Sequence, residues 1–288
     1  MRSGKKLPWR CRASPAGLSK EAPVLIWKAA MKTLTLCSLF TLLSVPVFSA
    51  IKTEVIEYKD GDAALEGFLA YDDSKTEPRP GVLVIHDWTG LQDYAKERTK
   101  MLAELGYVAF AADVYGKGVR PTDPKECAVM SGKYKSDLPL LRRRVTLGFE
   151  QLKKQKQVQP DKIAAIGYCF GGTSVLELAR SGADVKGVVS FHGALATTLP
   201  AAPGAVKAKI LACHGDADPF VKPAEVAGFK EEMANAKADL KFIAYPGAVH
   251  SFTKKEAGND PSKGQAYNEN ADRESWAEMK KFFKEIFS

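Results

Sequence analysis

Continuous apolar runs alternate with amphipathic stretches along most of the chain. Strands that are covered on both faces show unbroken apolar runs, so we expect buried parallel strands in these segments. The runs occupy residues 80–86, 107–112, 162–168, 185–191, 209–213 and 240–245. Between them, apolar residues recur with helical spacing. The helices expected from this spacing span residues 94–105, 138–154, 173–180, 223–234 and 272–287.

This alternation predicts an α/β fold with a mostly parallel, doubly wound sheet and helices on both faces. Residues 53–58 and 65–71 differ, because apolar and polar positions alternate there one by one. The turn-forming sequence Asp60-Gly61-Asp62 separates them, so we expect an antiparallel hairpin before the parallel strands. Active sites of such sheets lie at the carboxyl ends of the strands.

The segment 31–50 has the pattern of a secretory signal peptide. Met31 and Lys32 form a short basic start, residues 34–48 are mostly apolar, and cleavage is expected after Ser49 or Ala50. The apolar run is short for a membrane span, although an N-terminal anchor is the alternative. The sequence therefore predicts export, to a periplasmic compartment, with no stable membrane span after cleavage.

The charge of the chain is concentrated before the predicted mature domain. Residues 1–32 carry +7 of the formal net charge of +8, so the domain at 51–288 is nearly neutral. This balance does not favour a nucleic-acid partner. We interpret residues 1–30 as a non-native extension upstream of a natural start at Met31. A basic run over 133–144 is expected to be a solvated helix face.

Three cysteines remain in the predicted mature domain: Cys127, Cys169 and Cys213. An odd number leaves at least one free thiol, and the sequence does not decide whether Cys127 and Cys213 are bridged. No Cys/His spacing is typical of a metal site. We therefore expect neither a metal nor a cofactor.

The sequence GYCFGG at 167–172 is the strongest sign of chemistry. It lies between an apolar strand and an amphipathic helix, which predicts a sharp turn with Cys169 at the corner. This is the nucleophile elbow pattern with sulfur in place of oxygen, and glycines flank the nucleophile because neighbouring backbone passes close to it. The following helix directs its positive end toward the thiol and favours a thiolate. The pattern indicates acyl-transfer chemistry.

A thiol nucleophile needs a base and an acid that orients the base. Of the four histidines, His250 is the best base, because it follows the last predicted strand in a loop. The alternatives His86, His192 and His214 fit less well, and His214 is interpreted as a packed residue at a strand end. Asp216 and Asp218 both follow strand 209–213. We favour Asp218 as the acid, and Asp216 is expected to bind amides of the turn.

Five short segments, taken in their order along the chain, form one pattern. They are HDWTGL at 86–91, ADVYG at 112–116, GYCFGG at 167–172, GDADPFV at 215–221 and AVHSF at 248–252. Together they resemble the dienelactone hydrolase family, whose members are carboxymethylenebutenolidase-like proteins of the α/β-hydrolase superfamily, over residues 51–288. The resemblance implies an α/β-hydrolase fold and a triad of Cys169, Asp218 and His250. It also implies an oxyanion hole formed by the backbone N–H groups of Trp88 and Phe170.

The chain departs from the family pattern around the substrate. The family has a glutamate that contacts the resting thiol where this chain has Asp87, and an arginine where it has Lys254. Both side chains change in size together, so the pair is expected to persist, but lysine cannot give bidentate carboxylate recognition. Tyr115 belongs either to the core or to the substrate pocket. An arginine and a tyrosine of the family have no match before the long helix.

The sequence thus predicts a cofactor-free, monomeric hydrolase of small lactones or carboxylic esters, acting through a thioester on Cys169. Three alternatives remain. The first is a non-catalytic binding protein with the same fold, and the second is a thiol redox protein. The third is a peptidase-like serine/cysteine hydrolase of this fold.

Overall fold

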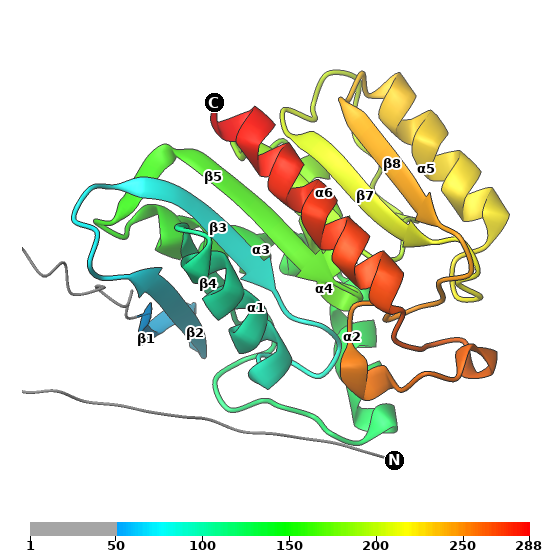
Figure 1. Ribbon diagram of the computed structural model, residues 1–288, viewed down its shortest axis with the longest axis horizontal. Coiled ribbons are helices and arrows are strands. Elements are labelled where there is room, and N and C mark those ends of the chain that lie inside the picture. The colour runs from blue at the N-terminus through cyan, green and yellow to red at the C-terminus, as the bar shows by residue number, and fades with distance from the viewer. Residues whose placement is uncertain (1–50) are drawn as a thin grey trace, which may run out of the picture. The chain divides into compact units, whose positions relative to one another are not determined.

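The structure is a computed structural model that describes residues 51–288. The predicted extension at 1–30 and the predicted signal peptide at 31–50 lie outside the described residues. The elements of the described part are shown in Figure 1.

A single eight-stranded sheet forms the centre of the fold, with strand order β1-β2-β4-β3-β5-β6-β7-β8. Only the β1–β2 and β2–β4 pairs are antiparallel, and the other pairs are parallel. The predicted doubly wound, mostly parallel sheet is therefore confirmed. The strands are β1 (Ile51–Asp60), β2 (Ala63–Asp72), β3 (Arg79–Ile85), β4 (Val108–Ala112), β5 (Val158–Tyr168), β6 (Gly187–Phe191), β7 (Lys209–Gly215) and β8 (Leu240–Tyr245).

The predicted hairpin is also present. Strands β1 and β2 pair along their whole length, and Gly61 occupies the turn with a φ of 57°. This left-handed backbone conformation costs glycine little, which explains the turn sequence.

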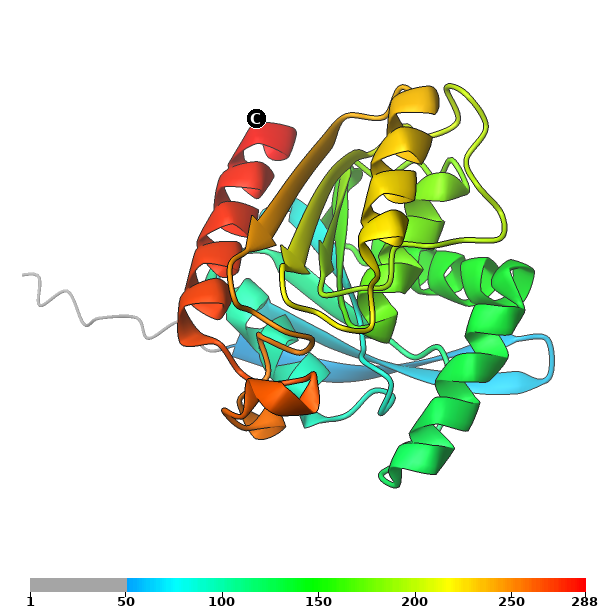
Figure 2. The ribbon, with the colours of Figure 1, turned by 90° about the vertical axis from the view of Figure 1, so that its right-hand side faces the viewer.

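Helices cover both faces of the sheet, as Figure 2 shows in a view along its edge. Residues of α1 and α6 share one buried cluster with Val82 and Val84 of β3. Residues of α2, α3, α4 and α5 share the other cluster with Leu83 and Ile85. Successive residues of β3 therefore face opposite layers, and the strand must be apolar on both sides. The helices are α1 (Asp93–Glu104), α2 (Pro124–Ser136), α3 (Leu138–Lys153), α4 (Phe170–Arg180), α5 (Pro223–Asn235) and α6 (Glu269–Phe287).

Helix α2 was missed by the sequence analysis. Its N-terminus is well specified, because the Asp123 side chain accepts hydrogen bonds from the N–H groups of Lys125 and Glu126 and a proline follows it. Its buried positions, however, are Cys127, Ser131 and Tyr134. These residues have helical spacing but are not strongly apolar, so hydrophobic periodicity did not reveal the helix. Two short 3₁₀ turns, Lys255–Ala257 and Pro261–Lys263, were missed as well.

The prediction of a solvated basic face on α3 was wrong in part. Arg144 is buried and its Nε lies 2.6 Å from a carboxylate oxygen of Asp60. Arg142 lies 2.7 Å from Glu177 of α4, whose carboxylate is completely buried. These arginines hold α3 against the hairpin and α4, because each neutralises a carboxylate that burial would otherwise disfavour.

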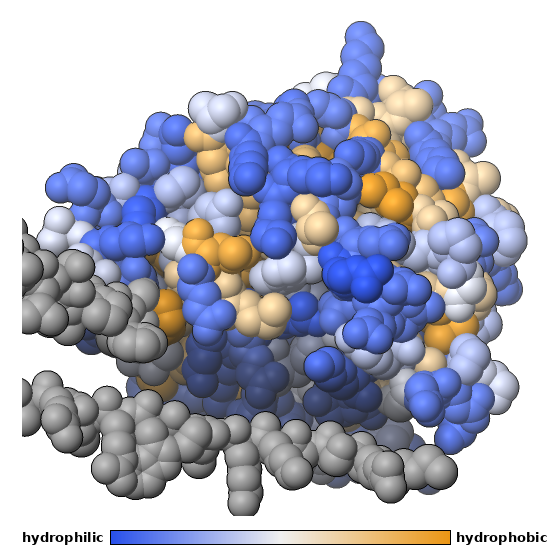
Figure 3. Space-filling view, in the orientation of Figure 1, coloured by the Kyte–Doolittle hydropathy of each residue, from blue (hydrophilic) through white to orange (hydrophobic). Residues whose placement is uncertain are grey.

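The face that carries α6 is mostly hydrophilic, with hydrophobic side chains in small, separate patches (Figure 3). Among residues 51–288, no helix is both long enough and apolar enough to span a bilayer. The same residues hold no group of three or more histidine, cysteine or acidic side chains arranged to bind a metal.

Candidate active site

Cys169 stands at the sharp turn between β5 and α4. Its backbone has φ 54° and ψ −114°, a conformation that a non-glycine residue rarely adopts. A Cβ on Gly167 would lie 2.0 Å from the carbonyl oxygen of Gly171, and one on Gly171 would lie 2.1 Å from that of Ile85. The elbow therefore requires glycine at both positions, as its sequence pattern indicated.

The structure brings Cys169, His250 and Asp218 together from three loops that follow β5, β7 and β8. The Sγ atom of Cys169 lies 3.0 Å from Nε2 of His250. Nδ1 of the same ring lies 2.9 Å from Oδ2 of Asp218, whose other oxygen accepts the N–H of Phe220 at 2.8 Å. The imidazole thus bridges a thiol and a buried carboxylate, which is the geometry of a nucleophile, a proton carrier and an orienting acid.

The pKa of His250 reflects both neighbours. Burial by itself would lower the pKa, but negative charge on Cys169 and the hydrogen bonds to Asp218 and Cys169 outweigh it and raise the pKa to about 10. The raised pKa favours the protonated ring, which can donate one N–H to Asp218 and the other to the sulfur of Cys169.

Phe170 and Trp88 carry the backbone N–H groups that are expected to form the oxyanion hole. Phe170 is the first residue of α4, so its N–H has no acceptor within the helix. Trp88 follows β3, and its carbonyl oxygen accepts the hydroxyl of Tyr115 at 3.1 Å. Within residues 51–288 neither N–H donates to another protein group. Both residues line one cavity with Cys169.

Tyr115 is buried behind the loop that carries Trp88. Its ring packs against those of His86, Tyr134 and Phe170, and it lines neither of the cavities beside Cys169. Of the two interpretations of Tyr115, the structure favours a core position that supports the loop of Trp88.

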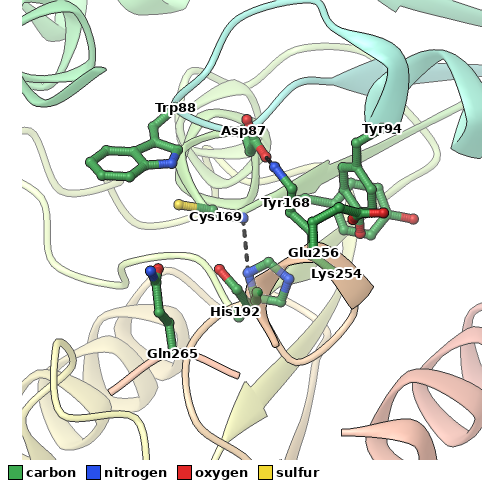
Figure 4. A pocket seen from close by; sticks show the side chains of 11 residues that line it. Asp87, Trp88, Tyr94, Tyr168, Cys169, His192, Lys254, Glu256 and Gln265 are labelled. Atoms are coloured by element: carbon green, nitrogen blue, oxygen red, sulfur yellow. Dashed lines mark hydrogen bonds and ion pairs between the residues drawn. The ribbon is translucent and has the colours of Figure 1, made fainter. Parts of the chain in front are cut away.

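Asp87 and Lys254 form an ion pair next to the thiol, with 2.6 Å between Oδ2 and Nζ (Figure 4). Burial opposes ionisation of Asp87, but the charge of Lys254 and hydrogen bonds from Lys254 and Thr89 lower the pKa of Asp87 below its ordinary value. Thr89 donates both its N–H and its hydroxyl to Oδ1 of Asp87. The shortened pair therefore persists, as the matched change in side-chain size indicated.

His192 is a residue of the site that sequence reasoning set aside. Its Nδ1 accepts the N–H of Cys169 at 3.1 Å, and its Nε2 lies 2.7 Å from the hydroxyl of Thr253. Burial and the charge of nearby His250 hold the pKa of His192 well below its ordinary value, so the ring is neutral. Its position directly after β6, beside the elbow strand, was the signal that could have indicated this role.

Backbone strain is concentrated at this edge of the sheet. Outside glycine, the described residues have a positive φ at four positions, and three of them are Cys169 (54°), His192 (42°) and Ser251 (60°). The fourth, Lys237, lies at the end of α5, away from the site. Such conformations cost about 1–3 kcal/mol each and persist where the surrounding structure enforces them.

Two cavities meet at Cys169. The smaller has a volume of about 200 Å³, and the larger has a volume of about 420 Å³. Both are lined by Trp88, Cys169, Ser251 and Gln265. The smaller cavity alone is lined by Asp87, Tyr94, Tyr168, His192, Lys254 and Glu256 (Figure 4). Residues that line only the larger cavity include Phe170, Ala194, Phe220, Val221 and His250, together with the polar residues Ser131, Lys135, Thr173 and Lys263.

The remaining candidates lie away from the reacting atoms. His214 is buried against Phe242, which agrees with a packed strand-end residue. Asp216 is exposed, and no hydrogen bond to amides of the turn is present among the described residues. Cys127 and Cys213 are free and buried, so they are not bridged to each other.

The chain is similar to several known proteins. A model described as "Dienelactone hydrolase family" matches residues 65–287. Protein usf from Aquifex pyrophilus is 27% identical over 82% of this chain and 99% of its own length. A protein of Saccharolobus solfataricus named "Putative carboxymethylenebutenolidase" is 27% identical over 80% of this chain and 98% of its own length.

Solved structures extend the comparison to the fold. The dienelactone hydrolase-like promiscuous phosphotriesterase P91, from metagenomic libraries, is 36% identical and superposes with a TM-score of 0.77, covering 83% of this chain and all of P91. The α/β hydrolase MGS-M1, from a deep-sea metagenome library, is 18% identical with a TM-score of 0.56 over 83% of this chain and 99% of its own. This second likeness shows a shared α/β-hydrolase fold.

Proposed function

Because the chain belongs to the dienelactone hydrolase family and is a hydrolase, we propose that it cleaves small lactones or carboxylic esters through a thioester on Cys169. The observation that carries this proposal is the position of one imidazole, His250, in contact with both the Cys169 sulfur and the Asp218 carboxylate. The names of the relatives support hydrolysis as the reaction class, because they include carboxymethylenebutenolidase and phosphotriesterase activities.

In the proposed mechanism, acylation starts from a thiolate–imidazolium pair formed by Cys169 and His250. The Cys169 thiolate attacks the carbonyl carbon, a C–S bond forms, and the π electrons move to the carbonyl oxygen. The N–H groups of Trp88 and Phe170 stabilise this oxyanion, an effect worth about 3 kcal/mol per donor in related sites. When the C–O bond breaks, the Nε2 proton of His250 goes to the leaving alkoxide. An ester then releases its alcohol, whereas a lactone keeps the alcohol attached to the acyl group.

Deacylation reverses these roles. Neutral His250, held by Asp218, takes a proton from water as the water oxygen attacks the thioester carbon. The tetrahedral intermediate collapses, the C–S bond breaks, and the electron pair returns to Cys169 as a thiolate. The products are a carboxylic acid and the alcohol, and the resting ion pair with His250 is restored. No cofactor takes part in this sequence of steps.

His192 and the Asp87–Lys254 pair act as positioning groups in this proposal. The carbonyl oxygen of Phe191 and Nδ1 of His192 both accept the N–H of Cys169, which leaves the oxyanion to the amides of Trp88 and Phe170. Asp87 holds the loop of Trp88 through Thr89, and Lys254 neutralises its buried charge. The substrate-contacting role expected for Asp87 and Lys254 is consistent with their place in the smaller cavity.

Trapping the thioester tests the proposal directly. The protein is mixed with p-nitrophenyl acetate, quenched in acid within one turnover, and examined by intact mass and peptide mapping. We expect one acetyl group on the peptide that contains Cys169, and none on the Cys213 peptide. Hydrolysis without any acetylated Cys169, or acetylation of another residue during turnover, would contradict the mechanism.

We also propose, from the sequence alone, that residues 31–50 direct export and that the mature monomer begins near Ile51. N-terminal sequencing of the protein from a periplasmic fraction tests both points. A chain that is found only in the cytoplasm and retains residues 31–50 would overturn the proposal.

A further inference from the structure

The two cavities beside Cys169 differ in size and chemistry. The larger, at about 420 Å³, falls in the range of ordinary ligand pockets, and Phe170, Ala194, Phe220 and Val221 make much of its wall apolar. The smaller, at about 200 Å³, falls below that range.

The position of His250 decides which cavity receives the alcohol part of an ester. Its Nε2 donates the proton to the leaving oxygen, so this oxygen must lie on the side of the sulfur that faces the imidazole. His250 lines the larger cavity and not the smaller one. The Cys169 sulfur also points away from Lys254 and Tyr94 in Figure 4, toward the side of Trp88 and Gln265. The alcohol therefore leaves through the larger cavity.

The acyl substituent must then extend from the carbonyl carbon into the smaller cavity. Charged and hydroxyl-bearing side chains dominate its wall, namely Asp87, Tyr94, Tyr168, Lys254 and Glu256 (Figure 4). Two carboxylates and one ammonium group make it unfavourable for an anionic substituent. A neutral polar substituent can instead form hydrogen bonds with the polar side chains of this wall.

We propose that the smaller cavity is the acyl subsite and the larger cavity the alcohol subsite, so that the preferred substrates are esters of short, neutral, polar acids with bulky apolar alcohols. This inference rests on the proposed function, since it assumes that Cys169 is acylated. The two cavities set different size limits for the two parts of the ester, a small one for the acyl group and a larger one for the alcohol. A long or bulky acyl chain is rejected even when the alcohol is small.

Two isomeric esters test the assignment with the wild-type protein. Benzyl acetate places its ring in the alcohol, whereas methyl phenylacetate places the ring in the acyl group. Acid release is followed in a pH-stat, and each kcat/KM is divided by the rate constant for hydrolysis by hydroxide. We expect benzyl acetate to be favoured by roughly tenfold or more, the range found when one pocket excludes a group by size. Equal values or a preference for methyl phenylacetate would overturn the assignment.

A matched pair of variants fills one cavity at a time. Ala194 lines only the larger cavity and Ala257 only the smaller one, and neither belongs to the proposed catalytic machinery. Ala194→Phe should lower kcat/KM for benzyl acetate roughly tenfold and leave methyl acetate nearly unchanged. Ala257→Phe should lower the ratio of benzyl butyrate to benzyl acetate by a similar factor, whereas Ala194→Phe should not change that ratio.

The outcomes separate the two proposals. If the effects of the two variants are exchanged, the subsites are assigned the wrong way round, although hydrolysis still depends on Cys169. If no ester is hydrolysed in a reaction that Cys169→Ala abolishes, the proposed function itself fails. Thermal unfolding of each variant shows whether it is folded, and turnover of methyl acetate shows that the site is intact. After division by the rate constant for hydrolysis by hydroxide, kcat/KM should also be higher for benzyl glycolate than for benzyl propionate, because the glycolate hydroxyl can form hydrogen bonds in the smaller cavity.

Discussion

A cysteine lies near the carboxyl end of β5 and another near that of β7, but the two thiols have opposite surroundings. Cys169 follows β5 in a strained turn that directs its sulfur toward His250. Cys213 lies within β7, where burial raises the pKa of its thiol to about 12 although the Tyr245 hydroxyl donates to it at 3.7 Å. Burial thus disfavours a thiolate at Cys213, and this thiol behaves as a small apolar side chain.

The histidines of the two regions differ in the same way. Next to Cys213, burial lowers the pKa of His214, and its Nδ1 has no hydrogen-bond partner within residues 51–288. His250 is also buried, but a carboxylate and a thiolate raise its pKa to about 10. The comparison shows that residue type alone does not join a thiol, an imidazole and a carboxylate. The geometry of the loops brings them into contact.

Removing each thiol in turn is the strongest test of this difference. Cys169→Ala should reduce kcat/KM for p-nitrophenyl acetate by at least about 10³-fold, since the nucleophile is lost. Cys213→Ala should leave kcat/KM close to that of the wild type and lower only the thermal midpoint. Comparable losses of activity in the two variants would show that Cys169 and Cys213 do not differ in their importance for hydrolysis.

The two aspartates after β7 provide the next test. Asp218→Asn removes the charge that orients and stabilises the His250 imidazolium, so we expect kcat/KM to fall by roughly 10²-fold. Asp216→Asn is the matched control, because Asp216 is exposed two residues away, and its activity should equal that of the wild type. Steady-state kinetics on both variants decides whether Asp218 or Asp216 serves the imidazole.

The pH dependence sharpens the comparison further. His250 loses its proton as the pH rises through about 10, and it can then no longer protonate an alkoxide. After correction for hydroxide, kcat/KM for benzyl acetate should fall about tenfold per pH unit above that value. The kcat/KM for p-nitrophenyl acetate should fall less, because its nitrophenolate leaves without needing a proton. Identical alkaline profiles would argue against proton donation by His250.

The smallest expected effect concerns the Asp87–Lys254 pair. Lys254→Met leaves a buried carboxylate unpaired, and we expect a loss of about 2 kcal/mol in the free energy of unfolding at neutral pH, reduced from the fully buried case because Lys254 is partly exposed. Lys254→Arg should restore most of it. The pair lowers the pKa of Asp87, so its contribution is present at neutral pH and is lost as the pH falls below the ordinary aspartate range. The difference between Lys254→Met and wild type should therefore shrink in acid during urea denaturation.

Local sequence patterns were sufficient for most of the sheet and for the residues that meet at Cys169. The continuous apolar runs located β3 to β8, because burial on both faces leaves a strong signal. Glycines located the elbow, because backbone contacts at Gly167 and Gly171 exclude any side chain. Chain order after the last strands then indicated Asp218 and His250.

Features that depend on tertiary contacts could not be obtained in this way. Helix α2 buries weakly apolar residues, so its pattern is faint. His192 acquires its role only when β6 lies beside β5 and places the ring under the Cys169 amide. The burial of Arg144 depends on the hairpin carboxylate of Asp60, which is distant in sequence. The two cavities depend on how the loop after β8 folds over the sheet edge.

The three left-handed residues at the site, Cys169, His192 and Ser251, have a consequence for engineering. Each holds a conformation costing about 1–3 kcal/mol, so this edge lowers the thermostability that the rest of the fold could provide. Laboratory selection for heat resistance would relax these positions first, Ser251→Gly being the simplest change because glycine holds a positive φ at little cost. A change that relaxes the backbone at Cys169 should also slow turnover, because the distortion there directs the sulfur toward its partner.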